Sequence, residues 1–227
     1  MSGTIDLSQL PTPRVVERLD FEEILDDRRQ ALLALVPASR RDEVEATLAL
    51  ESEPLTLLLQ ENAYRELVWR QRINEAARAV MLANAQGPDL EQLVANFNVQ
   101  RLVIDEGEPS ATPPVPPTLE SDNDLRLRAQ QAWEGLSVAG PRGAYVYHAL
   151  SADGRISDAT AISPAPAEAL VTLLSTEGDG HASEALVEIV TKALSAEDIR
   201  PVGDRLTVQS ATIVDYAIEA TLYIFPG

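Results

Sequence analysis

Apolar residues recur at helical spacing through residues 48–82, the longest such pattern in the chain. The pattern predicts one long helix over residues 54–85. Pro54 suits the first turn of this helix, where the missing N–H of proline costs no hydrogen bond. Gly87, which is followed by a proline, marks the expected end. We expect the N-terminal half of the chain to be built around this helix.

The predicted long helix carries two apolar stripes. The first stripe consists of Leu55, Leu58, Leu59, Trp69, Ile73, Ala77, Val80 and Met81. The second stripe lies nearly opposite and consists of Leu57, Tyr64, Val68 and Leu82. A surface helix normally has one apolar stripe. Two stripes therefore predict neighbours on two sides, as in a helical bundle, and make both sets candidate partner-interface residues.

Three polar residues, Asn62, Glu66 and Arg70, interrupt the first stripe at intervals of four residues. Two interpretations remain open. Polar groups on a packing face can form a ladder that sets register and partner choice at a cost in stability. Alternatively, Glu66 and Arg70 form a local, half-solvated ion pair at i,i+4 spacing.

The rest of the first half is predicted from shorter patterns. Residues 1–19 form an extended arm, and an extended piece covers residues 99–104. Further helices are expected over residues 21–35, 39–50 and 90–97, with Asp20 and Ser39 as N-caps. Residues 105–120 contain five prolines and predict a semi-rigid linker of polyproline II character. The chain therefore divides into an N-terminal helical region (1–104), a linker (105–120) and a second domain (121–227).

The second domain alternates between helix and strand patterns. Helices are predicted over residues 122–133, where Ser121 and Asp124 form a capping box, over 141–150, and over 183–194, whose inward residues are Leu186, Ile189, Val190 and Leu194. Strands are predicted over residues 156–162, 169–175, 205–209 and 213–225. The resulting β-β-α-β-β order indicates a helix packed on a mostly antiparallel sheet. The fold class of the whole chain is thus α+β.

Composition excludes several classes of partner. The net charge is −18 over 227 residues, so the surface repels nucleic-acid phosphates and anionic membranes. Cysteine is absent, which excludes disulfides and thiolate metal sites. We expect no nucleic acid, no membrane, no cofactor and no small-molecule substrate.

Two short motifs suggest an alternative, a cytoplasmic hydrolase or nucleotide-binding enzyme. Ser137 lies in a sequence close to a nucleophile elbow, but alanine replaces the second glycine and a helix precedes the serine. The loop at Gly178–Gly180 follows a strand and opens a helix, but its acidic residues disfavour a pyrophosphate. His148 and His181 are too isolated for a zinc site, and Asp122 begins no calcium loop because Leu127 stands where glycine is needed. These failures favour a chain that is not an enzyme and has no catalytic or metal-binding residues.

The long helix also carries a resemblance to a known family. The segments LALESEPLT, ENAYREL and RQRINEAA resemble the baseplate assembly protein J family of contractile tails, found in P2-like phages and R-type pyocins. The similarity continues through residues 136–162 and through RPVGDRLTVQSA at residues 200–211. It extends from the N-terminal IDLSQLP to the last residues, so its specificity comes from length and not from one short pattern.

This resemblance implies a structural role. Family members are wedge subunits in the inner ring of the baseplate around the central hub. Their expected partners are a protein I-class subunit, further copies of the same chain, the sheath initiator and hub-proximal proteins, and the expected location is the tail particle, assembled in the bacterial cytoplasm. The resemblance places residues 55–81 in a helical bundle with partner chains. Family members also continue into a further small domain beyond the part that this chain matches.

Overall fold

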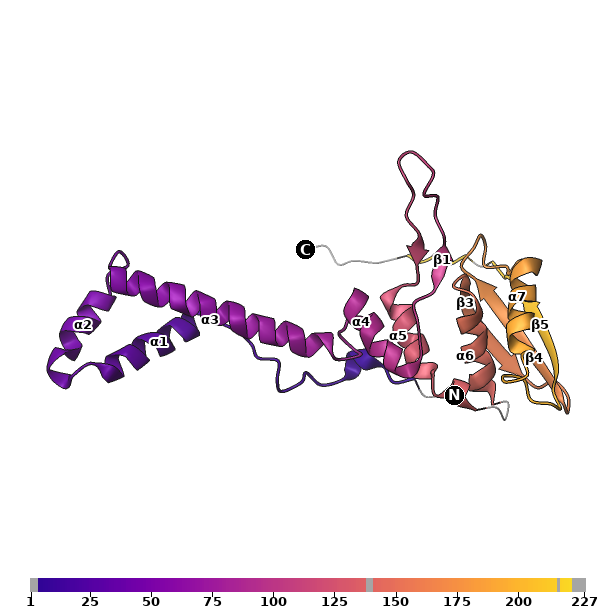
Figure 1. Ribbon diagram of the computed structural model, residues 1–227, viewed down its shortest axis with the longest axis horizontal. Helices are drawn as coiled ribbons and strands as arrows, with labels where there is room; N and C mark the ends of the chain where they lie inside the picture. Colours follow the sequence, from indigo (N-terminus) through magenta and orange to yellow (C-terminus); the bar gives the residue numbers. More distant parts are fainter. Residues whose placement is uncertain (1–3, 138–140, 216, 222–227) are drawn as a thin grey trace. The chain divides into compact units, whose positions relative to one another are not determined.

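The computed structural model of the protein describes residues 4–137, 141–215 and 217–221 (Figure 1). These residues form two compact units, one of residues 6–93 and one of residues 94–221 together with residues 4–5. The mixture of helices with two small sheets confirms the predicted α+β class. Each unit is described separately below.

The first unit is helical. Its elements are η1 (Leu7–Gln9), α1 (Phe21–Leu35), η2 (Ala38–Arg40), α2 (Arg41–Leu48), α3 (Pro54–Ala79) and α4 (Gly87–Val94), which reaches the next unit. Helix α1 has the predicted bounds, and the Asp20 side chain accepts hydrogen bonds from the N–H groups of Glu22 and Glu23. Ser39 does not act as the predicted N-cap, because it lies inside the short turn η2 and α2 starts only after Arg40.

The long helix α3 is shorter than predicted. It ends at Ala79 and not at residue 85, so its 26 residues span roughly 39 Å. The chain then forms a turn in which the Ala85 N–H donates to the Met81 carbonyl oxygen at 2.8 Å, and Ala85 is buried. The helical pattern of the sequence therefore continues past the end of the helix, as tertiary context often overrides local propensity. Gly87, expected to be a stop, instead begins α4.

Helices α1 and α3 pack against each other through a small core (Figure 1). The buried residues are Ile24 and Leu25 of α1 and Ala63 of α3. Phe21, Leu59 and Leu67 are partly buried around them. Burial of an Ile or Leu side chain contributes about 1.5–3 kcal/mol, so this contact alone is a modest source of stability.

The proline-rich residues form a paired loop in the second unit. Strands β1 (Val103–Asp105) and β2 (Thr118–Leu119) are antiparallel, and Glu108 and Val115 exchange backbone hydrogen bonds of 2.9 and 3.0 Å further out. Gly107 has φ +67°, and a Cβ there would collide with the Val115 carbonyl. The local structure therefore differs from the expected polyproline extension, because the two arms satisfy each other's backbone groups. The prediction that residues 105–120 are a linker between two domains stays a prediction. The boundary between the two compact units lies between residues 93 and 94.

A three-stranded sheet forms the centre of the second unit. The elements around it are η3 (Ala95–Phe97), α5 (Asp122–Gln131), η4 (Glu134–Leu136), α6 (Arg142–Ala152), β3 (Ile156–Ile162), β4 (Glu168–Ser175), α7 (Glu184–Leu194) and β5 (Arg205–Ser210). The strand order is β3-β4-β5. Strands β3 and β4 are antiparallel, as predicted, but β5 is parallel to β4. A helix that joins two neighbouring strands returns the chain in the parallel direction, which the prediction of a mostly antiparallel sheet overlooked.

The predicted fourth strand is not formed by the described residues. Residues 213–215 and 217–221 have no strand partner, and the rest of the predicted strand 213–225 lies outside the described residues. Described residues therefore give a β-β-α-β order and not β-β-α-β-β.

Helices α6 and α7 pack together on the sheet and enclose the main core. Val171 and Leu173 of β4 and Leu186, Val190 and Leu194 of α7 are fully buried there. Ile189 was expected to point inward, but it is 38% exposed. It occupies the edge of the apolar face of α7, beside Val190 and one turn from Leu186.

A buried ion pair joins the base of the loop to α5. Arg128 donates from Nε and Nη2 to the Glu120 carboxylate, both at 2.7 Å, and from Nη2 to the Gln100 carbonyl at 2.6 Å. The Leu102 N–H donates to the same carboxylate at 3.1 Å. Both side chains are 6% exposed, so the charges are removed from water and depend on each other.

We expect Glu120→Gln to destabilise the second unit by about 3–5 kcal/mol, because the substitution leaves the Arg128 charge buried without its counterion. Chemical denaturation of the chain would measure the free energy of unfolding. Glu106→Gln, at an exposed position of the same loop, is the matched control and should change it by less than about 0.5 kcal/mol. Equal stability of Glu120→Gln and the control would show that the buried pair does not hold the loop.

Candidate functional site

Large apolar side chains lie exposed along α3. They are Leu57, Leu58, Tyr64, Val68, Trp69 and Ile73, with Val80 just beyond the helix end. Trp69 is 69% exposed and Ile73 is 57% exposed. Monomeric proteins rarely leave apolar patches of this kind uncovered, so this surface is the candidate functional site of the first unit.

The rotation of α3 separates these side chains into two faces. With 3.6 residues per turn, Leu57, Tyr64 and Val68 lie on one line, and the line through Leu58, Trp69 and Ile73 lies roughly 120° away. The remaining third of the helix, with buried Thr56, Ala63 and Asn74, is the third face, and Ala63 packs there against α1. Helix α3 therefore has one face covered by its own chain and two open faces.

The members of the two predicted stripes divide among these faces. Leu59 packs partly against α1, so it belongs to the covered face. Leu55, Ala77, Met81 and Leu82 are half-buried, and the last two lie in the turn after α3 and not on the helix. The other apolar members are exposed. The two stripes thus describe most of the open surface but also contain part of the intramolecular contact.

A shallow groove of about 300 Å³ lies along the first open face and is lined by Tyr64, Leu67, Val68, Trp69, Gln71, Arg72 and Glu75. Its walls are mainly apolar and aromatic. Charged side chains at Arg72 and Glu75 border it, and these two form an exposed ion pair at 3.5 Å. An apolar groove with a charged rim is typical of a helix-binding surface.

The three polar residues of the first stripe have partners inside the chain. Arg70 donates to the Glu66 carboxylate at 2.6 Å, which is the local i,i+4 pair, and lies 3.5 Å from the Glu17 carboxylate. Arg28 of α1 donates from Nε to the other Glu66 oxygen at 2.6 Å. Asn62 donates to the Leu58 carbonyl at 3.0 Å. The hydrogen bond from Arg28 is the main cause that lowers the pKa of Glu66 below its usual value.

Asn74 is an important residue that the sequence did not single out. It is 3% exposed, accepts a hydrogen bond from the Glu17 N–H at 3.0 Å and donates to the Glu17 carbonyl at 2.9 Å. The amide thereby fixes the N-terminal arm on α3. The sequence feature that could have identified it is its distance of seven residues from Leu67, about two helical turns. This spacing places Asn74 on the same face of α3 as Leu67, the face that packs against α1.

The positions of the enzyme-type candidates favour structural roles. His148 bonds the Gly135 carbonyl at 3.2 Å, and burial lowers its pKa. In the Gly178–Gly180 loop, the Gly180 N–H donates to the Glu177 carbonyl and the Gly180 carbonyl accepts from the Ser175 N–H. These groups close a turn and are not offered to a phosphate. Ser137 is half-buried in the loop after η4.

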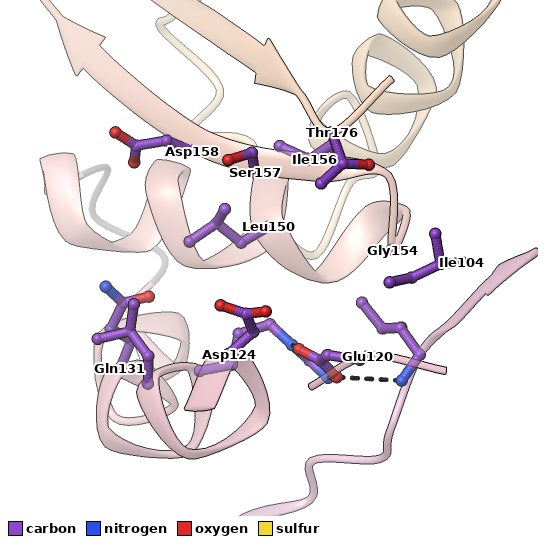
Figure 2. Close-up of a pocket in the computed structure, with 13 residues that line it drawn as sticks. Ile104, Glu120, Asp124, Gln131, Leu150, Gly154, Ile156, Ser157, Asp158 and Thr176 are labelled. Atoms are coloured by element: carbon purple, nitrogen blue, oxygen red, sulfur yellow. Dashed lines mark hydrogen bonds and ion pairs between the residues drawn. The ribbon is translucent and has the colours of Figure 1, made fainter. Parts of the chain in front are cut away.

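A small cavity lies between the base of the paired loop, α5 and β3 (Figure 2). Asp124, Gln131 and Leu150 lie on its helical side, and Ser157 and Asp158 lie on the strand (Figure 2). Its volume is about 120 Å³, room for about four water molecules at 30 Å³ each. Sites for small molecules usually measure about 300–1,000 Å³, so this cavity is smaller than a typical ligand site.

Within the described ranges, no group of three or more His, Asp or Glu side chains is arranged to hold a metal ion. Across the same residues, no helix has the length and apolar character needed to cross a bilayer.

Comparison with known proteins gives two matches to family models and one relative. Residues 51–108, which include α3, match the baseplate J-like N-terminal domain, and residues 137–210, which include α6 to β5, match the baseplate J-like central domain. The chain is 59% identical to baseplate protein J of Escherichia phage P2 over 223 residues, which is 98% of this chain and 74% of that protein.

The lowered pKa of Glu66 predicts a pH-dependent contact between α1 and α3. A carboxylate whose pKa is lower in the folded state stabilises that state at neutral pH, and this stabilisation is lost as the pH falls through the lowered pKa. Melting of the chain between pH 7 and about pH 3 should show a larger loss of stability for the wild type than for Glu66→Gln. Glu61→Gln, which removes an exposed pair with Arg65 on the same helix, should retain the wild-type pH dependence. Identical pH profiles for the wild type and Glu66→Gln would contradict this role of Glu66.

Proposed function

Because this chain belongs to the family of baseplate J-like proteins, we propose that it is a structural wedge subunit in the inner ring of a contractile-tail baseplate. The identity of 59% to baseplate protein J of phage P2 over nearly the whole chain is the observation that carries this proposal. A structural protein of a phage-tail baseplate acts through its contacts with other subunits. The function therefore resides in surfaces and not in a catalytic centre.

The two open faces of α3 support an assignment of the N-terminal helices to a bundle with partner chains. One face of α3 is already occupied by α1, and the other two faces expose side chains such as Tyr64 and Trp69. A helix with two further apolar faces has room for two neighbouring helices. We assign these places to helices of a protein I-class subunit and of a further copy of this chain.

The polar ladder takes a different part in this proposal. Glu66 already bonds Arg28 and Arg70, and its side chain is 21% exposed. A charge with two partners in its own chain contributes little attraction to a third. We therefore assign Glu66 and Arg70 to the intramolecular ion pairs that join α1 to α3. Asn62 lies on the open face of α3 that carries Leu58, so we place it at the border of the partner surface.

The remaining contacts follow from the resemblance and from charge. We propose that the sheath initiator and hub-proximal proteins contact other surfaces of the subunit in the assembled tail particle, in a phage or an R-type pyocin. The net charge of −18 favours neighbours with basic surfaces and disfavours contact with nucleic acid.

The bundle assignment predicts that Leu58→Asp weakens complex formation with a protein I-class partner. The substitution places a charge in a desolvated interface, which should weaken binding by about 2 kcal/mol or more, roughly thirtyfold. Co-expression and pull-down would measure the complex. Leu58 is 55% exposed, so the isolated chain should keep its melting temperature.

Leu35→Asp is the matched control, because Leu35 is also an exposed leucine (84%) but is the last residue of α1 and not part of α3. It should form the complex normally. Tyr64→Asp tests the other open face separately. Normal complex formation by both Leu58→Asp and Tyr64→Asp would remove α3 from the interface.

A further inference from the structure

A cleft of about 590 Å³ lies within the first unit, beside the C-terminal end of α3. The N-terminal arm, residues 7–16, runs past this end of the helix and forms one wall (Figure 1). The turn after α3, residues 81–86, forms the other wall, and apolar side chains such as Leu10 and Leu82 line both. The volume falls within the range of about 300–1,000 Å³ that is usual for binding sites. We call this feature the arm cleft.

Hydrogen bonds within the first unit hold both walls of the arm cleft in place. The arm is fixed where the backbone of Glu17 bonds the buried Asn74 side chain, at 2.9 and 3.0 Å. The turn is fixed where the Asn84 N–H donates to the Met81 carbonyl oxygen at 2.9 Å. Pro13 restricts its own φ and so stiffens the arm. A partner therefore meets a cleft whose walls are already ordered, which reduces the entropy lost on binding.

The arm cleft is a basic site in an acidic chain. Of the described residues that line it, Arg78 alone is charged, although the net charge of the whole chain is −18. Arg78 is exposed and lies in the last turn of α3. A cation beside apolar side chains favours a segment that carries both a carboxylate and an apolar side chain. An arginine in the last turn of a helix also interacts favourably with the helix dipole, so a test has to separate these two roles.

The arm cleft continues the groove on the first open face of α3. Glu75 is the last residue along the helix that lines the groove, and Arg78 lies about one turn further on. The distance along the axis from Tyr64 to Arg78 is roughly 21 Å, at 1.5 Å per residue. A partner helix of this length in the groove would bring the adjoining part of its chain to the arm cleft.

We propose that the arm cleft binds an acidic, apolar segment of the protein I-class partner, next to the helix that lies in the groove. An apolar side chain of this segment contacts Leu10 and Leu82, and a carboxylate pairs with Arg78. The inference rests on the proposed function, because it assigns a second contact to the same partner. It adds the position and the chemistry of that contact.

Reversal of the charge in the arm cleft tests the ion pair. Arg78→Glu should raise the Kd for the purified protein I-class subunit at least about tenfold, because two carboxylates then meet. Arg78→Lys keeps the charge and should stay within about threefold of the wild type. Arg40→Glu, which changes an exposed arginine outside the arm cleft, is the matched control and should keep the wild-type Kd. Titration of the chain with the partner measures all four values.

Thiol labelling tests whether the partner enters the arm cleft. The chain contains no cysteine, so Ala83→Cys places a single thiol in the wall formed by the turn. A maleimide should label it in the free chain, and the complex should be labelled at least about tenfold more slowly, because a packed interface excludes the reagent. Ala111→Cys, a half-buried alanine of the paired loop in the second unit, is the matched control and should react equally in both states.

A wild-type Kd for Arg78→Glu would overturn the proposal, even if the melting temperature of the free chain fell, because Arg78 would then serve only the dipole of α3. Equal labelling of Ala83→Cys in the free chain and the complex would also overturn it, as would failure to label the free chain, since the arm cleft would then be filled already. In each of these cases, weak binding by Leu58→Asp or Tyr64→Asp would still support the bundle assignment. Failure of the wild-type chain to bind the partner would instead remove both proposals.

Discussion

The contact between α1 and α3 determines which surface of the first unit is free. Its apolar part is small, with Ile24, Leu25 and Ala63 as the buried residues, so polar groups contribute a large share of its specificity. Asn74 holds the N-terminal arm, and Glu66 joins α1 to α3 through Arg28. Because these intramolecular contacts use only one face of the 26-residue helix α3, its other faces remain available for partners. A larger intramolecular core would have covered the surface that an assembly protein needs.

The second unit contains a proline-rich loop, which has few backbone N–H groups that could donate hydrogen bonds to fix its conformation. Glu120 and Arg128 fix its base by a buried, fully hydrogen-bonded pair. Removal of either charge is costly in such a site, whereas replacement of both by apolar groups is often neutral. The pair therefore specifies where the loop emerges from the unit more than it adds to overall stability.

The sequence predicted those elements whose signals are local. Helix α1 and strand β3 have their predicted bounds, because Asp20 caps the helix and turn-forming residues lie on both sides of the strand, at Gly154 and Pro164. The errors involve tertiary contacts: β5 pairs in parallel with β4, α3 ends before the buried Ala85, and the two arms of the proline-rich loop pair with each other. No local pattern encodes these contacts.

The candidate surface was predicted to a similar extent. Periodicity identified Leu58, Tyr64 and Trp69, which are exposed on α3. It also assigned Leu59 to the same stripe, although the partial burial of Leu59 against α1 depends on tertiary packing. The buried amide of Asn74 was missed because a polar residue within a helix normally indicates a solvent-facing position.

The parallel connection through α7 has a consequence for the order of folding. Strands β3 and β4 are joined by a short turn, whereas β5 reaches β4 only after the whole of α7 has been traversed. The entropy lost on closing a loop increases with its length, so we expect β3 and β4 to pair first and β5 to join last.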